Sequence, residues 1–226
     1  MGRSTQTKPD WDRLYETALA QEGHFTTQQA LDAGYSSQLL VKYLDNGKIT
    51  RVRRSVYRLK HFPPGQQEDL VALWLWSERA GVFSYETALM LHELADVLPA
   101  RAHLTLPAKW RKRRLRVPEA VVLHHADVPK RDRAWVGAVP VTSPARTLAD
   151  SAADNVSPEF LSSAVRQALA RGMVSRTQAT AVRTDQRARC MKPQTYATPA
   201  AVYTLDLVLR RVAKESHDRR TVTHGR

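Results

Sequence analysis

The sequence is poor in the residues that build disulfide-bonded, membrane-spanning or zinc-binding proteins. Its 226 residues include one cysteine, Cys190, which excludes an internal disulfide framework and a Cys-rich zinc site. The longest apolar run, Leu70 to Trp76, is far too short to cross a bilayer. The N-terminal residues also lack a hydrophobic secretion segment. We therefore expect a cytoplasmic protein without a membrane partner.

Acidic residues are also scarce relative to basic ones. Asp and Glu number 22 against 35 Lys and Arg, which gives a net charge of +13 and a pI near 10.3. The hydrophobic fraction of 42% is ordinary for a globular protein of one or two domains. An excess of positive charge on such a protein indicates a polyanionic partner: DNA, RNA or an anionic membrane.

The positive charge is concentrated in two short runs. Between Lys42 and Lys60 there are seven basic residues and one Asp, and six of the eight residues from Lys109 to Arg116 are basic. The segment from Glu68 to Asp96 instead holds six acids and one Arg. This uneven pattern favours a located anion-binding surface, with a merely solvated basic face as the alternative for either run.

The N-terminal residues predict three short helices. Apolar residues at helical spacing predict the first over residues 11–22. Thr26 or Thr27 can cap the second, with Gln29 placed as the return partner of a capping box, and Gly34 suits its C-terminus. Ser36 can cap the third, which should end near residues 46–47.

Two strand-like runs follow the third helix. They span Ile49–Val52 and Val56–Leu59, with Arg53-Arg54-Ser55 at the tip between them. Two helices joined by a Gly-containing turn and followed by a basic hairpin are the outline of a winged helix-turn-helix, which places one helix in a DNA major groove. The alternative is a helical hairpin with a solvated basic face and no role in DNA binding.

The predicted DNA-contacting residues lie on the third helix and the wing. Leu40 and Leu44, with Tyr43 and Leu39 in part, should form the buried stripe of the helix and leave its polar residues exposed. Gln and Ser reach base edges, whereas Lys and Arg reach phosphates. We predict DNA contacts from Thr27, Gln28, Ser36, Ser37, Gln38, Lys42, Lys48, Arg51, Arg53, Arg54, Tyr57 and Arg58.

After a predicted linker over residues 61–65, helices and strands alternate. We expect a helix over Gln66–Arg79 with one apolar face that carries Leu70, Leu73, Trp74 and Trp76, the two tryptophans as core residues. Further elements are a helix capped by Ser84, strands over Arg101–Leu106 and Ala120–His125, a hairpin around Gly137, and helices that start at Ser143-Pro144 and Ser157-Pro158. The fold class is thus α+β: an N-terminal winged helix-turn-helix followed by a mixed α/β C-terminal domain.

Candidate catalytic groups are few, and each has a simpler explanation. His92, Glu93 and Asp96 lack the spacing of an HExxH zinc site, and adjacent strand residues such as His124 and His125 point to opposite faces. Arg146 and Asp150 have the spacing of a helix-surface ion pair. We therefore predict no enzyme, no catalytic residue, no metal and no cofactor.

Residues 23–59 resemble the N-terminal winged-helix domain of the AbiEi family of antitoxins. The resemblance rests on Phe25-Thr26-Thr27, Ala30, Gly34 and Ser36, followed by a wing that reads RRSVYRL, in which Ser55 stands where the family usually has Gly. It continues through residues 83–94, 97–99, 103–107 and 139–150, where Tyr85 and Glu93 replace a common His and Gly. In all, residues 23–175 are similar to the family.

Membership implies an antitoxin of a type IV toxin–antitoxin system. Such a protein represses its own operon by binding double-stranded promoter DNA with inverted repeats, and it counteracts a nucleotidyltransferase-like toxin that it need not bind directly. On this interpretation the second domain carries the antitoxin surface, for which the candidates are Lys109, Arg111, Lys112, Arg113, Arg114 and Arg116. Alternatives are a plain transcriptional regulator whose second domain senses a ligand or oligomerises, and a nuclease-related or RNA-binding enzyme.

The predicted domain boundaries follow these assignments. Residues 1–62 form the DNA-binding domain, residues 63–190 the antitoxin domain and residues 191–226 a helical tail whose origin the sequence leaves open. The tail begins MKPQTYATPAA, which is similar to the K-T-Y-A-T-P-A-A phrase that often opens the cognate toxin. A fused or frameshifted gene junction would explain this similarity, and a helical antitoxin tail over about residues 199–214 is the alternative.

Overall fold

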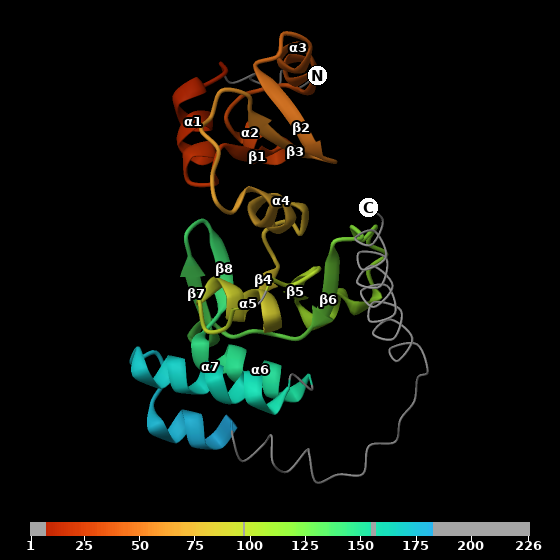
Figure 1. Ribbon diagram of the computed structural model, residues 1–226. Helices are drawn as coiled ribbons and strands as arrows, with labels where there is room; N and C mark the ends of the chain where they lie inside the picture. Colours follow the sequence, from red (N-terminus) through yellow and green to blue (C-terminus); the bar gives the residue numbers. More distant parts are fainter. Residues whose placement is uncertain (1–7, 97, 155–156, 183–226) are drawn as a thin grey trace, which may run out of the picture. The chain divides into compact units, whose positions relative to one another are not determined.

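The computed structural model describes residues 8–96, 98–154 and 157–182 (Figure 1). The predicted tail, residues 191–226, lies outside these ranges. Helices and strands are mixed along the chain, which confirms the predicted α+β class. The N-terminal elements are α1 (Trp11–Leu19), β1 (His24–Thr26), α2 (Thr27–Asp32), α3 (Ser37–Asp45), β2 (Ile49–Arg53) and β3 (Val56–Leu59).

These N-terminal elements form a winged helix-turn-helix. Their strands make an antiparallel sheet in the order β1-β3-β2, in which Tyr57 of β3 faces Phe25 on one side and Arg51 on the other. The three helices pack on this sheet around a core that includes Leu14, Tyr35 and Leu40. The sheet and helices occur in the predicted order, so the sequence-based assignment of this module is confirmed.

Short polar residues and glycine set the ends of α2 and α3, as predicted. The Thr26 hydroxyl accepts a hydrogen bond from the Gln29 N–H, and the Gln29 side chain accepts one from the Thr26 N–H, which completes a capping box. Gly34 follows α2 with a φ of 84°, a left-handed conformation that glycine adopts at little cost. Ser36 caps α3 by accepting a hydrogen bond from the Leu39 N–H.

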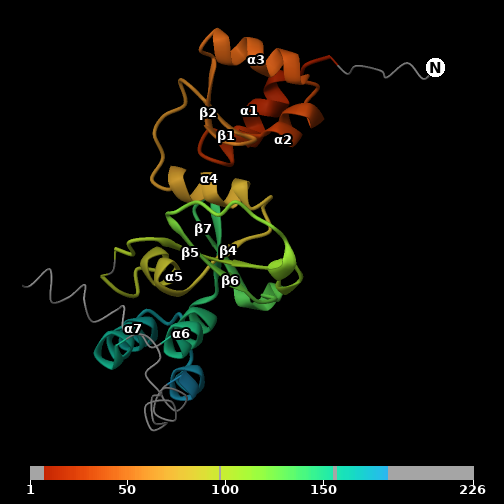
Figure 2. The ribbon, with the colours of Figure 1, turned by 90° about the vertical axis from the view of Figure 1, so that its right-hand side faces the viewer.

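Helix α4 (Glu68–Trp76) differs from its prediction because it is apolar on more than one face. Every side chain from Val71 to Leu75 is buried, whereas the sequence indicated a single apolar stripe. The helix contacts strands β1, β2 and β3 on one side and strand β8 (Val139–Thr142) on another. Figure 2 shows it between the N-terminal elements and the second sheet. Trp74 is a core residue as predicted, and Trp76 is half-buried against the same core.

The second sheet has five strands in the order β6-β5-β4-β8-β7. Neighbours β5 and β6 run parallel, as do β4 and β8, whereas β4 and β5, and β7 and β8, are antiparallel. The strands and hairpin predicted from the sequence are therefore present, and Gly137 makes the hairpin turn with a φ of 56°. The strands are β4 (Val82–Phe83), β5 (Ala102–Leu106), β6 (Val121–His125), β7 (Arg133–Val136) and β8 (Val139–Thr142).

Three helices after β4 lie complete within the described ranges. They are α5 (Tyr85–Leu91), α6 (Pro144–Ala153) and α7 (Pro158–Ala170), and the 3-10 turns Ala108–Lys112 and Lys130–Asp132 lie in the loops. Helix α5 packs on β5, β8 and α6, and α6 packs on α7, around a second core that includes Leu89, Leu148 and Leu161. No helix in the described ranges is both long and apolar enough to span a membrane.

The predicted serine caps are confirmed in two of three helices. Ser143 accepts a hydrogen bond from the Arg146 N–H, and Ser157 accepts one from the Phe160 N–H. Ser84 occupies the N-cap position of α5 without such a bond, which corrects the prediction. Its hydroxyl is fully buried beside the sheet and instead shares a 2.7 Å hydrogen bond with the Thr105 hydroxyl.

Candidate nucleic-acid interface

Helix α3 presents one polar face to solvent, as the sequence predicts. The Leu40 side chain is buried in the core, and Leu39, Tyr43 and Leu44 are half-buried. The side chains of Ser37, Gln38, Val41, Lys42 and Asp45 are exposed. A helix with an exposed N-terminal turn of short polar residues and a following lysine has the chemistry to contact base edges and a phosphate.

The predicted contact residues around the N-termini of α2 and α3 have partners within the protein. The Ser36 hydroxyl is occupied as a cap, and the Gln28 side chain donates to the Asp32 carboxylate at 2.9 Å. Thr27 is half-buried, and its N–H donates to the Ser55 carbonyl at 3.0 Å. This last bond connects the start of α2 to the tip of the wing and so fixes the wing beside the helix pair.

The wing carries its basic residues on β2 and at the tip. Arg51 and Arg54 are exposed, and Arg53 is half-buried next to an irregularity in the β2–β3 register. Within the described part of the chain, the buried Nε of Arg53 has no hydrogen-bond partner. Ser55 has a φ of 62°, so it takes the left-handed conformation for which the family's glycine is suited.

Three predicted contact residues face other parts of the protein. The Arg58 side chain is 15% exposed and donates to the carbonyl oxygens of Leu59 and Phe62 and to the Glu68 carboxylate. The Tyr57 ring stacks on that of Phe25. Lys48 places its ammonium 5.1 Å from the centre of the Tyr43 ring.

Sequence patterns cannot reveal these placements. The alternation of side chains along a strand predicts which face a side chain lies on, but it does not predict which residue a long side chain contacts there. Arg58 in particular is held by the fold and is therefore not available to contact DNA.

The second basic run lies in a loop that starts as a 3-10 turn. Arg113 forms an ion pair with Glu78, and its guanidinium lies 4.2 Å from the centre of the Trp110 ring. The other basic residues of the run are all exposed: Lys109, Arg111, Lys112, Arg114 and Arg116. Among the described residues none of these five takes part in an ion pair, so their charges face solvent.

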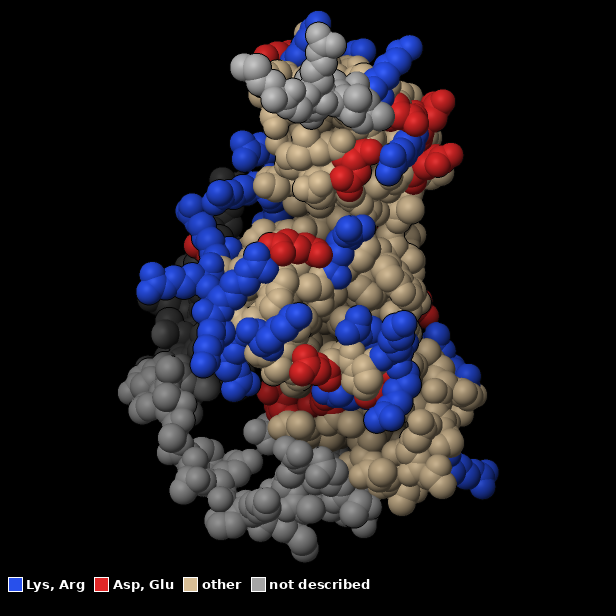
Figure 3. All heavy atoms as spheres, turned by 180° about the vertical axis from the view of Figure 1, so that it is seen from behind, with Lys and Arg blue, Asp and Glu red and all other residues tan. Residues whose placement is uncertain are grey.

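The wing tip and the second basic run line the same hollow. This hollow of about 730 Å³ is bordered by Arg54 on one side and by Arg113, Arg114 and Arg116 on another. Figure 3 shows Lys and Arg side chains gathered along one side of the visible face, with few Asp and Glu among them. The two runs that are distant in the sequence thus contribute to one positively charged surface.

The second sheet contains a cluster of half-buried histidines that sequence reasoning did not connect. His124 on β6 is hydrogen-bonded to His103 on β5 at 3.1 Å, and its ring stacks on that of Tyr85. The sequence indicates that His124 and His125 point to opposite faces of their strand, and both side chains are half-buried. Burial lowers the pKa of His103 and of His124, so the pair favours its neutral form.

The remaining titratable candidates are explained by structural contacts. The buried His92 ring donates from Nε2 to the Thr142 carbonyl oxygen at 2.7 Å, and burial lowers its pKa. The described residues include no group of three metal-ligating side chains. The predicted ion pair between Arg146 and Asp150 is present at 2.7 Å, although burial raises the pKa of Asp150.

The sheet order, the capped helix pair and the basic hairpin define the N-terminal part as a winged helix-turn-helix of the kind found in transcription regulators. Comparison with protein families agrees: residues 12–60 match the family described as "Transcriptional regulator, AbiEi antitoxin". The match confirms the resemblance predicted for residues 23–59. The family is one of antitoxins that regulate transcription.

A solved structure is also similar in part. The crystal structure of the RV2827C protein from Mycobacterium tuberculosis is 17% identical, with a TM-score of 0.40, over 80% of this chain and 83% of that chain. No curated protein matches the chain significantly.

Proposed function

We propose that this protein is the antitoxin of a type IV toxin–antitoxin system. It represses its own operon by binding promoter DNA, and it counteracts a nucleotidyltransferase-like toxin. The observation that carries the proposal is the exposed polar face of α3 beside the basic wing, within the segment that matches the antitoxin regulator family.

In the proposed complex, α3 enters the major groove through its N-terminal turn. Ser37 and Gln38 reach base edges, and Lys42 contacts a phosphate on the flank of the groove. Arg51 and Arg54 of the wing contact the adjacent backbone. Inverted repeats in the promoter would then be bound by two copies of the chain, each of which contacts one half-site.

The first experiment measures the salt dependence of operator binding by the full-length protein. Arg51→Ala and Arg54→Ala should each flatten the slope of log affinity against log salt by about one unit, because each removes a phosphate contact. The matched control is Arg131→Ala, which removes an arginine that is 86% exposed on the second part of the chain. An unchanged slope in both wing variants would contradict the assignment of the wing to DNA.

The second experiment separates repression from protection against the toxin. Gln38→Ala with Lys42→Ala should abolish repression of a promoter reporter and leave growth rescue intact. Reversal of charge at Arg111, Lys112 and Arg114 tests the proposed antitoxin surface, because these side chains are exposed and should be replaceable without loss of stability.

We expect the charge-reversed protein to lose rescue at an unchanged melting temperature. Full rescue would reject the assignment of this run to toxin neutralisation. A protein that instead loses operator binding and retains rescue would show that the run serves DNA. Full-length variants are preferable to fragments, because α4 belongs to a core that both parts of the chain share.

A further inference from the structure

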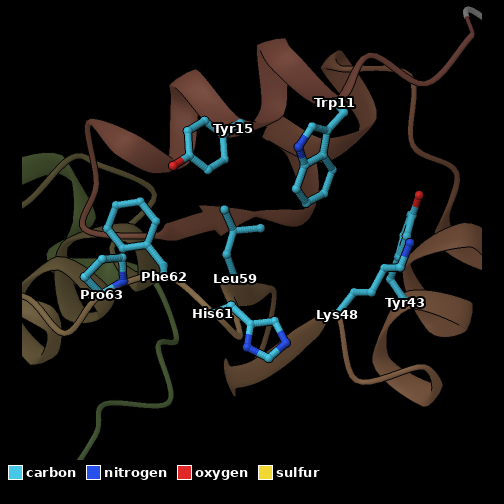
Figure 4. Close-up of a pocket in the computed structure, with 8 residues that line it drawn as sticks. All are labelled: Trp11, Tyr15, Tyr43, Lys48, Leu59, His61, Phe62 and Pro63. Carbon is cyan, nitrogen blue, oxygen red and sulfur yellow. The ribbon is translucent and has the colours of Figure 1, made fainter.

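A pocket of about 490 Å³ opens on the winged helix beside α1. Figure 4 shows Leu59 at its base, Trp11 and Tyr15 on one side, Phe62 near one end, and Tyr43 with Lys48 at the other end. The lining residues come from α1, from α3 and the turn after it, and from the end of β3 with residues 61–63 that follow it. A hollow formed by three separate elements of one small module has walls that the fold holds in place.

Four aromatic rings surround this pocket without filling it. The Trp11 side chain is 43% exposed and that of Tyr15 is 42% exposed, although both lie on the apolar face that the sequence predicts for α1. The ring centres of Trp11 and Tyr43 are 6.5 Å apart, and those of Tyr15 and Phe62 are 6.3 Å apart. The outer surfaces of these rings remain in contact with water, where a planar apolar molecule would replace that water favourably.

One cation stands at the edge of the aromatic walls. Lys48 is exposed, and its ammonium lies over the Tyr43 ring. In the ranges that the structure describes, Lys48 belongs to no ion pair. A positive charge held beside apolar walls and without a carboxylate partner suits a ligand that combines an aromatic ring with an anionic group.

We propose that this pocket binds a small planar aromatic molecule that carries one carboxylate or a comparable anionic group. The ring stacks among Trp11, Tyr15 and Tyr43, and the anionic group pairs with Lys48. The volume lies in the range of small-molecule sites, which are mostly apolar with a few polar groups that orient the ligand.

The pocket and the exposed face of α3 use different sides of that helix. Tyr43 faces the pocket, whereas Gln38 and Lys42 face solvent, so a bound ligand leaves the polar face free. The proposal therefore stands independently of DNA binding. A ligand here would nevertheless contact α3 directly through Tyr43.

The test uses the full-length protein and two matched probes, naphthalene-2-carboxylate and its neutral isostere naphthalene-2-carboxamide. We expect calorimetry to give a dissociation constant below about 1 mM for the carboxylate and affinity about tenfold weaker for the amide. Trp11→Ala should weaken both probes about tenfold, because it removes a wall of the pocket. Lys48→Met should remove the preference for the carboxylate and leave the affinity for the amide unchanged.

The control variant is Trp135→Ala, since Trp135 is a 60% exposed tryptophan on β7 that does not line the pocket. It should leave both affinities unchanged. Absence of carboxylate binding, equal affinity for the two probes, or binding that neither Trp11→Ala nor Lys48→Met alters would overturn the proposal. Light scattering measures the oligomeric state and so tests the alternative that a second copy of the chain occupies this surface. If Trp11→Ala converts a dimer to a monomer, the surface is an interface between two copies and the ligand proposal is rejected.

Discussion

Arg58 at the end of the wing and Glu68 at the start of α4 form a partly buried ion pair. The two side chains are 15% and 30% exposed, and the same guanidinium donates to the carbonyl of Phe62 in the segment between them. The pair therefore closes the connection between the winged helix and α4. This arginine supports the fold of the segment, whereas its neighbours at the wing tip face solvent.

Arg58→Met should destabilise the protein without altering its electrostatic attraction to DNA. Removal of the guanidinium deprives the Glu68 carboxylate and the carbonyl oxygens of Leu59, Phe62 and Pro63 of the Arg58 donor. This loss should cost about 2–4 kcal/mol of unfolding free energy. Urea unfolding gives the stability, and the salt slope of operator binding should match the wild type. A flattened slope at unchanged stability would instead place Arg58 at a phosphate.

Ser55→Gly should stabilise the protein. Ser55 has a φ of 62°, a conformation that costs a residue with a Cβ about 1 kcal/mol. Glycine avoids this cost but loses more conformational entropy on folding, which offsets only part of the gain. The expected rise in melting temperature is about 1–3 °C for a chain of this length. A thermal melt checks it. A lower melting temperature would mean that the serine hydroxyl makes a compensating contact.

Gln38→Ala should weaken operator binding without loss of stability, whereas Leu40→Ala should lower the stability of the fold. Gln38 is exposed on α3, so its loss should weaken operator binding by about 1–3 kcal/mol, with little change on random DNA or in stability. Leu40 is 2% exposed in the core, so its truncation should cost about 2–5 kcal/mol of unfolding free energy. Binding titrations on both DNAs and a thermal melt distinguish the two. Equal losses of affinity for operator and random DNA would show that Gln38 contacts the DNA backbone and not a base.

Stability should fall as the pH drops below about 6.5, the ordinary pKa of histidine in an unfolded chain. Burial lowers the pKa of His24 and of His92, so the unfolded state takes up protons before the folded state does. The loss begins near pH 6.5 and continues until the folded histidines also titrate. His92→Gln can keep a donor for the Thr142 carbonyl while it removes one titrating group.

Urea unfolding at several pH values between 5.5 and 7.5 measures this effect. The variant His92→Gln should show a slope of stability against pH that is smaller by up to about 1.4 kcal/mol per pH unit. The comparison uses the slope, so a uniform loss of stability in the variant does not affect it. Identical slopes would contradict a neutral buried His92.

Local signals account for the parts of the fold that the sequence predicts well. Thr26 with Gln29, Gly34, Ser36 and Ser143 act through hydrogen bonds or backbone angles within a few residues, so their effect is visible in the sequence. The periodicity of α3 likewise separates its buried and exposed residues. These signals place the helix-turn-helix and wing, and with them the exposed face of α3.

Relationships between distant segments account for what the sequence does not reveal. Helix α4 is buried on several faces because two sheets contact it, and its composition alone does not show that. The orientation of the Arg58 side chain depends on its ion pair with Glu68. Trp11 and Tyr15 are exposed because no other element in the described part of the chain covers them. The one available signal for the pocket is that the small N-terminal module has more aromatic residues than its core can bury.

Val56 of the wing is 1% exposed and belongs to the buried cluster formed with α4 and the second sheet. Packing therefore constrains the exchange of this winged helix for that of a similar regulator as a way to change operator preference. A transplanted module must bring a side chain at position 56 that fits against the recipient's α4, or α4 must be exchanged with it. Chimeras joined after α4 should consequently fold more often than chimeras joined at the proline-rich segment before it.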